Sequence, residues 1–367
     1  MDAIAALVRE PNGPFQIENI TVDAPRADEI LVRIKAVGIC HTDIVVASGA
    51  LGTPFPAVLG HEGAGIVEAV GADVTKVAVG DKVLMTFNSC GVCGRCKGGD
   101  PAYCENFSAL NFGCCRADGS NALHQHETPL AGNFFGQSSF ASLAIATERN
   151  VVKVAADADL ATLAPLGCGV QTGAGGVIRS LAAKPGSSLV VMGGGAVGLS
   201  AVLGGVIAGC ATIILIEPRE ERRSLALSLG AHHAIDPKAG DTAAAVRAIL
   251  PGGADNIIDT SGNPGAISAA VSMLAAKGSL GLIGIPNPMD SALTVSILNL
   301  MVVGMTIKGI TEGDSLPDEF LPQLVAWQKA GKLPIERFIK TYPFAKINEA
   351  IEDSHHGHAV KAVLLLD

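Results

Sequence analysis

A glycine run at residues 193–198 constrains the fold of this chain more than any other segment, because of its surroundings. The run reads Gly-Gly-Gly-Ala-Val-Gly, directly follows an apolar stretch at 188–192 and opens an apolar helical stretch. In that setting Gly193 permits a tight turn, Gly195 lets a pyrophosphate approach the backbone, and Gly198 lets helix and strand pack closely. The helix N-terminus then receives the phosphate charge. The pattern predicts a dinucleotide-binding strand–turn–helix unit.

An acidic residue in the next strand bears on the choice of dinucleotide. Glu217 lies nineteen residues after Gly198, at the end of an apolar stretch. A carboxylate there accepts hydrogen bonds from the adenosine ribose hydroxyls and repels a 2′-phosphate, so the sequence favours NAD over NADP. Arg219 and Arg222 lie just downstream, and their charges would weaken that preference if they reached the ribose.

The chain divides into two parts that differ in their secondary-structure pattern. Up to about residue 165, short strand-like pieces are bounded by glycine and proline, whereas from about residue 185 strand and helix patterns alternate. Such alternation predicts an α/β fold with a parallel, doubly wound sheet. The tail returns to irregular pieces and ends in a strand at 360–366. We therefore expect a β-rich domain formed by 1–169 and 312–367, and a dinucleotide-binding domain at 170–311.

Four cysteines stand within fifteen residues at x2, x2 and x7 spacing: Cys90, Cys93, Cys96 and Cys104. Glycines between them allow a short loop to curl, and four thiolates match a closed tetrahedral zinc site. Because four protein ligands leave no position for substrate, such a zinc is structural. A disulfide knot is the alternative, but nine cysteines, an odd number, in a long chain without a signal peptide argue against it. We expect a zinc-stapled lobe at 88–106.

Three further candidate ligands are scattered along the chain. Cys40 ends a predicted strand, His61 lies in a glycine-framed turn, and Cys168 precedes the dinucleotide-binding domain. Each residue alone is compatible with an ordinary buried position. Two cysteines and one histidine with an open fourth position are, however, the arrangement of a catalytic zinc.

Composition excludes several classes of partner. The formal net charge of −9 and the lack of a basic stripe argue against nucleic acid and anionic membranes. The 32 residues between Lys184 and Glu217 are uncharged, but the glycine run inside them indicates a buried strand, turn and helix rather than a membrane span. The first residues show no basic segment or cleavage site, and the cysteines suit a reducing compartment. We expect a cytoplasmic protein.

Taken together, these motifs resemble the zinc-dependent medium-chain alcohol dehydrogenases over essentially the whole chain. The resemblance is carried by residues 38–43, 60–65, 90–104, 167–169 and 193–198. Within that family the chain is most similar to bacterial aryl-alcohol (benzyl) and geraniol-type alcohol dehydrogenases, on residues 135–140, 165–173 and 309–313. The resemblance implies a GroES-like catalytic domain, a Rossmann domain, NAD and two zinc ions per subunit.

The resemblance also assigns roles around the catalytic zinc. The metal ligands would be Cys40, His61 and Cys168. Asp43 would orient His61 through its other ring nitrogen. Glu62 would lie behind the metal and enter its shell during ligand exchange.

Proton transfer is expected to begin at Thr42, which would bond the substrate hydroxyl and pass its proton to the nicotinamide ribose. In much of the family a histidine three residues later completes this relay, whereas this chain has Val45 there. The proton must then leave through the ribose to water or to an unidentified base. We expect this difference to alter the pH dependence, and not the reaction, in which zinc activates an alcohol and hydride passes to NAD⁺.

The resemblance implies contacts with the dinucleotide from several separate parts of the chain. Basic residues at His41 and Lys361 would bind the pyrophosphate. The nicotinamide would be contacted by Thr172, Val197, Ile283 and Ile310. The first two would pack against the ring, and the carbonyls of the last two would hold its carboxamide.

The substrate class rests on five candidate pocket residues: Thr86, Phe87, Phe134, Phe135 and Ile285. This mostly apolar set suits a flat primary alcohol of the benzyl, cinnamyl or geraniol type, although the phenylalanines are equally compatible with an ordinary core. One alternative is a formaldehyde dehydrogenase that acts on a glutathione adduct, for which no clear basic cluster is visible. A second is a zinc- and nucleotide-binding protein without turnover.

The apolar stretch at 293–307 closes the dinucleotide-binding domain. In the family an edge strand there pairs across a two-fold axis, so the resemblance implies a homodimer or homotetramer.

Overall fold

The computed structural model describes residues 1–367 and divides into two compact units. The first unit comprises Met1–Cys168, Leu316–Gln328 and Ile335–Asp367, and the second comprises Gly169–Ser315 and Lys329–Pro334. Each unit has its own sheets and its own buried core.

The boundary after the second unit differs from the expected one. Residues 312–315, which we expected in the β-rich domain, belong to the second unit. Their place is explained by Gly313, where an added Cβ would lie 2.4 Å from the carbonyl oxygen of Gln171. This turn therefore packs directly on helix α5 (Gly169–Gly175).

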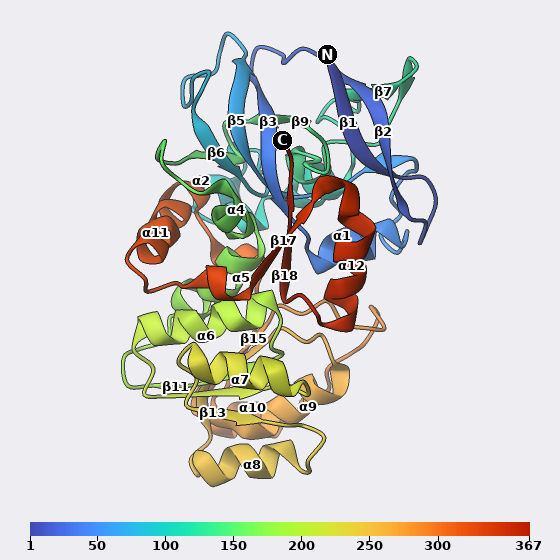
Figure 1. Cartoon of the computed structure of the whole chain (residues 1–367). Coiled ribbons are helices and arrows are strands. Elements are labelled where there is room, and N and C mark those ends of the chain that lie inside the picture. The colour runs from blue at the N-terminus through green and yellow to red at the C-terminus, as the bar shows by residue number, and fades with distance from the viewer. The chain divides into compact units, whose positions relative to one another are not determined.

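The first unit contains two sheets (Figure 1). The five-stranded sheet has the order β4-β1-β2-β7-β8, and the seven-stranded sheet has the order β10-β6-β5-β3-β18-β17, with β9 also paired to β3. All strand pairs except β17–β18 are antiparallel. The strands are β1 (Asp2–Val8), β2 (Phe15–Val22), β3 (Glu29–Gly38), β4 (Ala57–Val58), β5 (Glu62–Val70), β6 (Lys82–Met85), β7 (Leu123–Gln125), β8 (Thr128–Pro129), β9 (Leu143–Thr147), β10 (Val151–Lys153), β17 (Ile339–Pro343) and β18 (Lys361–Leu365).

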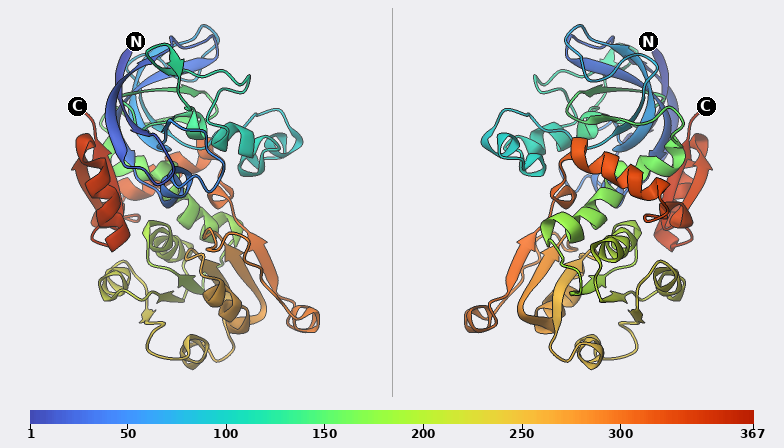
Figure 2. Two further views of the ribbon diagram at one scale, coloured as in Figure 1. Left: turned by 90° about the vertical axis from the view of Figure 1, so that its right-hand side faces the viewer. Right: turned by 90° about the vertical axis from the view of Figure 1, so that its left-hand side faces the viewer.

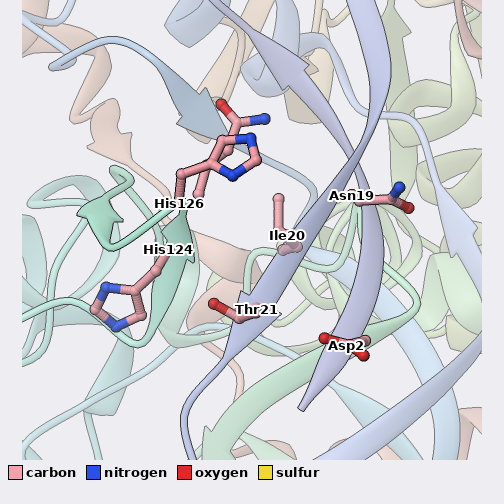
Figure 3. A pocket seen from close by; sticks show the side chains of 7 residues that line it. Asp2, Asn19, Ile20, Thr21, His124 and His126 are labelled. Atoms are coloured by element: carbon pink, nitrogen blue, oxygen red, sulfur yellow. The ribbon is translucent and has the colours of Figure 1, made fainter.

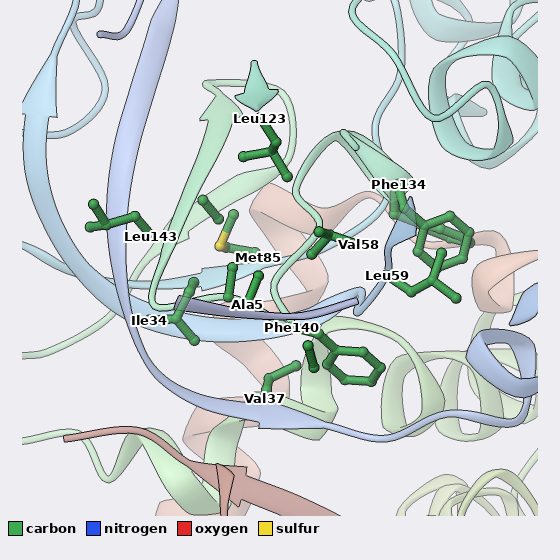
Figure 4. Packing of buried hydrophobic residues seen from close by; sticks show 14 of the residues in the cluster. Ala5, Ile34, Val37, Val58, Leu59, Met85, Leu123, Phe134, Phe140 and Leu143 are labelled. Carbon is green, nitrogen blue, oxygen red and sulfur yellow. The ribbon is translucent and has the colours of Figure 1, made fainter. Parts of the chain in front are cut away.

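Helices in this unit are short, apart from two in the C-terminal part of the chain. They are α1 (His41–Ala47), α2 (Gly94–Lys97), α3 (Phe107–Phe112), α4 (Leu160–Leu163), α11 (Pro317–Lys329) and α12 (Ile347–His356). The core between the sheets is filled mainly by aliphatic side chains and phenylalanine (Figure 4). Ile34 of β3, Met85 of β6 and Phe140 are fully buried within it.

The second unit confirms the expected doubly wound α/β fold. Its six strands are parallel, in the order β13-β12-β11-β14-β15-β16, and helices cover both faces of the sheet (Figure 2). The strands are β11 (Ser188–Met192), β12 (Thr212–Ile216), β13 (His233–Ile235), β14 (Ala254–Asp259), β15 (Leu274–Leu282) and β16 (Thr306–Gly309). The helices besides α5 are α6 (Ala196–Ala208), α7 (Glu220–Ser228), α8 (Thr242–Ile249), α9 (Pro264–Met273) and α10 (Ile297–Val303).

The uncharged run flagged in the sequence forms β11, the glycine turn, α6 and β12. All five residues of β11 are buried, as expected for a central parallel strand covered on both faces. Helix α6 ends at Gly209, whose φ of 76° is the left-handed conformation of a helix C-cap. None of the helices has the length and apolar character that crossing a membrane requires.

Candidate active site

Three residues that are distant in sequence converge in the first unit. Cys40 lies between β3 and α1, His61 immediately precedes β5, and Cys168 ends the unit's first segment. Their ligand atoms all lie within 4.8 Å of one another. Two thiols and one imidazole facing a common point are the donor set of an open zinc site.

Asp43 fixes the imidazole of His61. Its Oδ1 lies 2.8 Å from Nδ1, and its carboxylate also accepts the backbone N–H groups of Cys40 at 2.9 Å and Gly60 at 3.1 Å. The side chains of Asp43 and His61 are fully buried. The other ring nitrogen, Nε2, is buried and makes no hydrogen bond. An orphaned imidazole nitrogen beside two thiols fits a bound metal ion, since buried polar atoms otherwise find partners.

The thiol of Cys40 is poised to ionise. A hydrogen bond from the Cys168 thiol holds the pKa of Cys40 well below its ordinary value, against the opposing effect of burial, and the charge of His61 acts in the same direction. The thiolate is the form that binds metals, so this environment favours a ligand.

Glu62 and Lys361 form a buried ion pair next to His61. Lys361 Nζ lies 2.5 Å from Glu62 Oε2 and donates a hydrogen bond of 2.9 Å to the Ile39 carbonyl. Burial raises the pKa of Glu62, which the Lys361 charge partly offsets. Burial lowers the pKa of Lys361, but the charge and hydrogen bond of Glu62 together with the charges of the nearby cysteines raise it overall. Lys361 thus neutralises the carboxylate behind the candidate metal site, a role that the sequence did not suggest. Its expected contact with a pyrophosphate stays a prediction.

The first turn of α1 carries the residues expected to handle the proton and the pyrophosphate. Thr42 Oγ1 lies 3.8 Å from Cys40 Sγ, so the hydroxyl is adjacent to the candidate metal site. His41 is exposed and Val45 is half-buried on the same helix. Neither the hydroxyl relay nor the contact of His41 with the dinucleotide is tested by these positions.

The four clustered cysteines come together as expected for a metal lobe. All are free thiols, and the distances Cys90 Sγ–Cys96 Sγ and Cys93 Sγ–Cys104 Sγ are both 4.0 Å. Tetrahedral thiolates at zinc would be about 3.8 Å apart, given Zn–S bonds of about 2.3 Å. Backbone N–H groups of Val92 and Cys93 lower the pKa of Cys90 to about 6, whereas burial raises the pKa of Cys96 to about 12. The geometry is compatible with a structural zinc, although it does not count the ions.

In the second unit, the glycines at 193–198 have the backbone conformation and the close packing that a dinucleotide-binding turn requires. Gly193 has a φ of 97°, a conformation that favours glycine, and a Cβ at Gly198 would lie 1.8 Å from the Gly193 carbonyl oxygen. A Cβ at Gly195 would meet nothing within 4 Å, so its outer side is open to a ligand. Val197 lies in the first turn of α6 and is half-buried.

The carboxylate of Glu217 reaches back to this turn. Its Oε2 accepts the Gly194 N–H at 2.6 Å, and its Oε1 accepts the Arg219 N–H at 2.9 Å. Arg222 lies beside it with a buried Nε that makes no hydrogen bond, and burial lowers the pKa of this guanidinium. The acidic and the basic candidate for the ribose site are therefore both at the glycine turn.

The turn that contains Glu312 is hydrogen-bonded to α5. Glu312 is buried with a φ of 50°, and its Oε2 accepts hydrogen bonds from Gln171 Nε2 at 3.2 Å and Thr172 Oγ1 at 3.4 Å. Ile283 and Ile310 follow β15 and β16, at the carboxyl edge where doubly wound sheets bind ligands. In the sequence, residues 309–313 contribute only to the resemblance to aryl-alcohol dehydrogenases, and no role of Glu312 is predicted from it.

The candidate pocket residues divide by unit. Thr86, Phe87, Phe134 and Phe135 are buried in the first unit, and Ile285 is half-buried in the second. Thr86 Oγ1 donates a hydrogen bond of 2.6 Å to the Gly167 carbonyl. The three phenylalanines belong to the buried hydrophobic cluster of the unit, and two of them contact His61.

One surface pocket contains none of the expected site residues. It is lined by Asp2, Asn19, Ile20, Thr21, His124, Gln125 and His126 (Figure 3). His124 Nε2 lies 3.0 Å from an oxygen of Asp23, so this histidine is already engaged. The chemistry-bearing residues lie elsewhere in the unit.

Comparison with known proteins decides the family. An alcohol dehydrogenase GroES-like domain matches residues 26–156, and a zinc-binding dehydrogenase domain matches residues 196–329. The chain is 46% identical over 367 residues to a geraniol dehydrogenase of Castellaniella defragrans, covering 100% of this chain and 98% of the relative. This chain is a zinc-binding alcohol dehydrogenase.

Solved structures agree with this assignment of the dehydrogenase. A zinc-binding-domain alcohol dehydrogenase from Burkholderia ambifaria is 47% identical, with a TM-score of 0.98 over 100% of this chain and 99% of that one. A benzyl alcohol dehydrogenase from Acinetobacter calcoaceticus is 39% identical, with a TM-score of 0.97 over 100% of both chains. The resemblance, the fold class and the enzyme class expected from the sequence are confirmed, and the family supports zinc and NAD(P) as cofactors in general.

Proposed function

We propose that this dehydrogenase interconverts a primary aromatic or allylic alcohol and its aldehyde, with NAD as the hydride acceptor. The observation that carries the proposal is the convergence of Cys40, His61 and Cys168, with the buried Nε2 of His61 left without a hydrogen bond. Relatives named geraniol dehydrogenase and benzyl alcohol dehydrogenase favour an allylic or aromatic substrate. The phenylalanines packed around His61 are chemically suited to such an alcohol.

Each cofactor would contribute defined chemistry. When bound, zinc would polarise the substrate oxygen as a Lewis acid, and NAD⁺ would accept the hydride. Asp43 keeps Nδ1 of His61 occupied and so directs Nε2 toward the metal. Thr42, adjacent to Cys40, would accept a hydrogen bond from the substrate hydroxyl and donate its own to the nicotinamide ribose, so that the proton is relayed to the ribose. Because Val45 offers no ionisable group, the proton would leave from the ribose to water or to an unidentified base. Lys361 balances the charge of Glu62.

The finer cofactor assignments follow from the same residues. We assign one catalytic zinc to Cys40, His61 and Cys168, and one structural zinc to the four clustered cysteines. The first unit would form the catalytic domain, and the second unit the NAD-binding domain. Glu217 at the glycine turn supports NAD over NADP.

We further propose that the enzyme is a homodimer, or a homotetramer built from such dimers. Helix α10 exposes five large apolar side chains to solvent: Ile297, Leu298, Leu300, Met301 and Val302. It immediately precedes β16, which is an edge strand of the parallel sheet. A second copy would cover both the apolar helix and the unpaired strand edge. None of the nine cysteines forms a disulfide, which supports a reducing compartment such as the cytoplasm.

The decisive experiment follows NADH formation by absorbance. Purified enzyme is supplied with NAD⁺ and, separately, benzyl alcohol, cinnamyl alcohol, geraniol, ethanol, or formaldehyde with glutathione, and the series is repeated after chelation of zinc. We expect turnover of the aromatic and allylic alcohols, little on ethanol, and loss of activity with the metal.

The other results separate the alternatives. Activity on ethanol alone would leave the mechanism standing and contradict the substrate class. Turnover only with formaldehyde and glutathione would favour the glutathione-adduct enzyme. No turnover by zinc-loaded protein on any substrate would favour a zinc- and nucleotide-binding protein without catalysis.

A further inference from the structure

An aromatic turn at residues 133–138 lies against the ring of His61. The Phe135 ring stacks on the imidazole, with centroids 4.4 Å apart and an interplanar angle of 25°. The Phe134 ring meets the same imidazole edge-on, at 5.4 Å and 90°. Both phenylalanines are at most 3% exposed. With Asp43 at Nδ1, these contacts leave the imidazole little freedom to rotate.

The backbone of the turn adopts an unfavourable conformation at the stacked residue. Phe135 has a φ of 53°, and Asn133 and Ser138 have φ values of 57° and 50°. A left-handed backbone is unusual for a bulky aromatic residue, and it persists only where surrounding contacts impose it. A residue free to relax would not remain in this conformation.

Hydrogen bonds impose that conformation and tie the turn to the segment that carries His61. Gln137 donates to the His61 carbonyl at 2.9 Å and accepts the Gly63 N–H at 3.1 Å. Asn150 donates to the Phe135 carbonyl at 3.3 Å. One buried amide therefore bonds the backbone at His61 and at Gly63, and another bonds Phe135 itself.

The aromatic turn is braced by the helix that follows the four-cysteine lobe. Phe112 and Phe107 of α3 contact the Phe135 ring at 5.2 Å and 6.4 Å, both in edge-to-face arrangements. The N–H of Phe107 donates to the Cys104 carbonyl at 2.8 Å, so the first residue of α3 is hydrogen-bonded to the last cysteine of the lobe. Phe135 is thus packed between the metal lobe and the candidate metal ligand.

We propose that Phe135 is a positioning residue: it fixes the plane of the His61 imidazole and thereby the direction of Nε2 toward the catalytic metal. A leucine would occupy apolar volume without offering a flat face, whereas a tyrosine would keep the ring. The inference rests on the proposed function, because it takes Cys40, His61 and Cys168 to hold the metal. It goes further by assigning Phe135 an action on the metal ligand, independent of any contact with the alcohol.

The test measures metal release in the absence of alcohol. Zinc-loaded enzyme is mixed with excess chromophoric chelator, and the release phases of the catalytic and four-cysteine sites are followed. The variants are Phe135→Leu, Phe135→Tyr and a matched control, Phe320→Leu. Phe320 is 1% exposed, and its ring contact is with Trp327, at 6.3 Å.

Release from the catalytic site should be about 3- to 10-fold faster in Phe135→Leu, the range expected for loss of one aromatic contact. It should stay near the wild-type rate in Phe135→Tyr and Phe320→Leu, and release from the four-cysteine site should be unchanged in all three. Cobalt substituted at the catalytic site should show a shifted visible spectrum only in Phe135→Leu, because that spectrum reports ligand geometry.

Three results would overturn the inference. Unchanged release and an unchanged cobalt spectrum in a folded Phe135→Leu protein would remove the positioning role. Equal acceleration at both sites would assign Phe135 to general packing. A wild-type enzyme that binds zinc only at the four cysteines would contradict the proposed function, and the inference with it, whereas the first two results contradict the inference alone.

Discussion

At the scale of single residues, the candidate site contains buried side chains that have a nitrogen without a hydrogen-bond partner in the protein. His61 has Nδ1 engaged and Nε2 without a hydrogen bond, and Arg222 has a buried Nε without one. Burying such atoms is costly unless a ligand completes them. A metal at His61 and a dinucleotide at Arg222 would therefore give these buried nitrogens the partners that they lack in the protein alone.

Replacing Asp43 tests the orientation of His61. Asp43→Asn keeps the shape but removes the charge that holds Nδ1, so zinc affinity at the catalytic site should fall about 10- to 100-fold. Competition with a graded chelator series measures this affinity. Asp81→Asn is the control, because Asp81 also accepts a backbone N–H and pairs with a lysine, outside the candidate site. Equal zinc affinity in Asp43→Asn and wild type would contradict the assigned role.

The ribose site offers a test of cofactor preference. Glu217→Ala removes the charge that repels a 2′-phosphate, so the ratio of kcat/KM for NADP to that for NAD should rise about 10- to 100-fold. Arg222→Ala should change the ratio in the opposite direction, because Arg222 lies beside the same turn and its guanidinium interacts with the charge of Glu217. Initial rates with both dinucleotides give the ratios, and a ratio unmoved by Glu217→Ala would place the selectivity elsewhere.

At the scale of elements, alanine substitutions at two glycines of one turn should have different effects, one on stability and the other on dinucleotide binding. Gly198→Ala places a Cβ 1.8 Å from the Gly193 carbonyl, so it should lower the free energy of unfolding by about 1–3 kcal/mol or more. Gly195→Ala meets open space in the protein, so it should fold normally and weaken NADH binding about tenfold. Denaturant unfolding and NADH fluorescence titration distinguish the two, and equal NADH affinity in Gly195→Ala would argue against a pyrophosphate at this turn.

The C-terminal helix gives a pH-dependent prediction. Asp353 of α12 pairs with Lys340 and Tyr342 of β17, and these hydrogen bonds lower the pKa of Asp353 to about 2. Because its folded pKa is below its unfolded value, Asp353 stabilises the fold above pH 4 and loses that effect as the pH falls toward 2. Asp353→Asn should therefore be less stable than wild type at pH 7, with a smaller difference at pH 3. Denaturant unfolding at both pH values checks this, and a constant difference would exclude the charge as the cause.

The parts predicted from sequence are those with local signals. Fixed spacing identified the four cysteines and the glycine turn, and strand–helix alternation predicted the parallel sheet. The boundary between α9 and β15 has no such local signal: the helix ends at Met273 and the strand begins at the next residue, because Leu274 pairs with Ala254 of the neighbouring strand. The stacking of Phe135 on His61 could not be predicted from the sequence either, since it depends on a left-handed backbone imposed by hydrogen bonds from residues distant in sequence.

At the scale of the whole molecule, the exposed side of α10 predicts self-association. Met301→Glu places a charge among apolar side chains that are mostly about three-quarters exposed in the single chain, so it should shift the protein toward monomer. Met289→Glu, at an exposed methionine outside the helix, is the control. Light scattering after size-exclusion chromatography measures the mass. A dimer or tetramer that persists in Met301→Glu would locate the interface elsewhere.

The order of the chain also bears on biosynthesis. Strand β18 pairs with both β3 and β17, and it supplies the Lys361 that neutralises Glu62. The second unit, by contrast, is almost entirely made from the continuous segment Gly169–Ser315. A ribosome therefore completes nearly all of the dinucleotide-binding unit before β18 exists. Until that last strand emerges, the nascent first unit lacks a strand of its seven-stranded sheet, and Glu62, beside the candidate metal ligands, lacks Lys361.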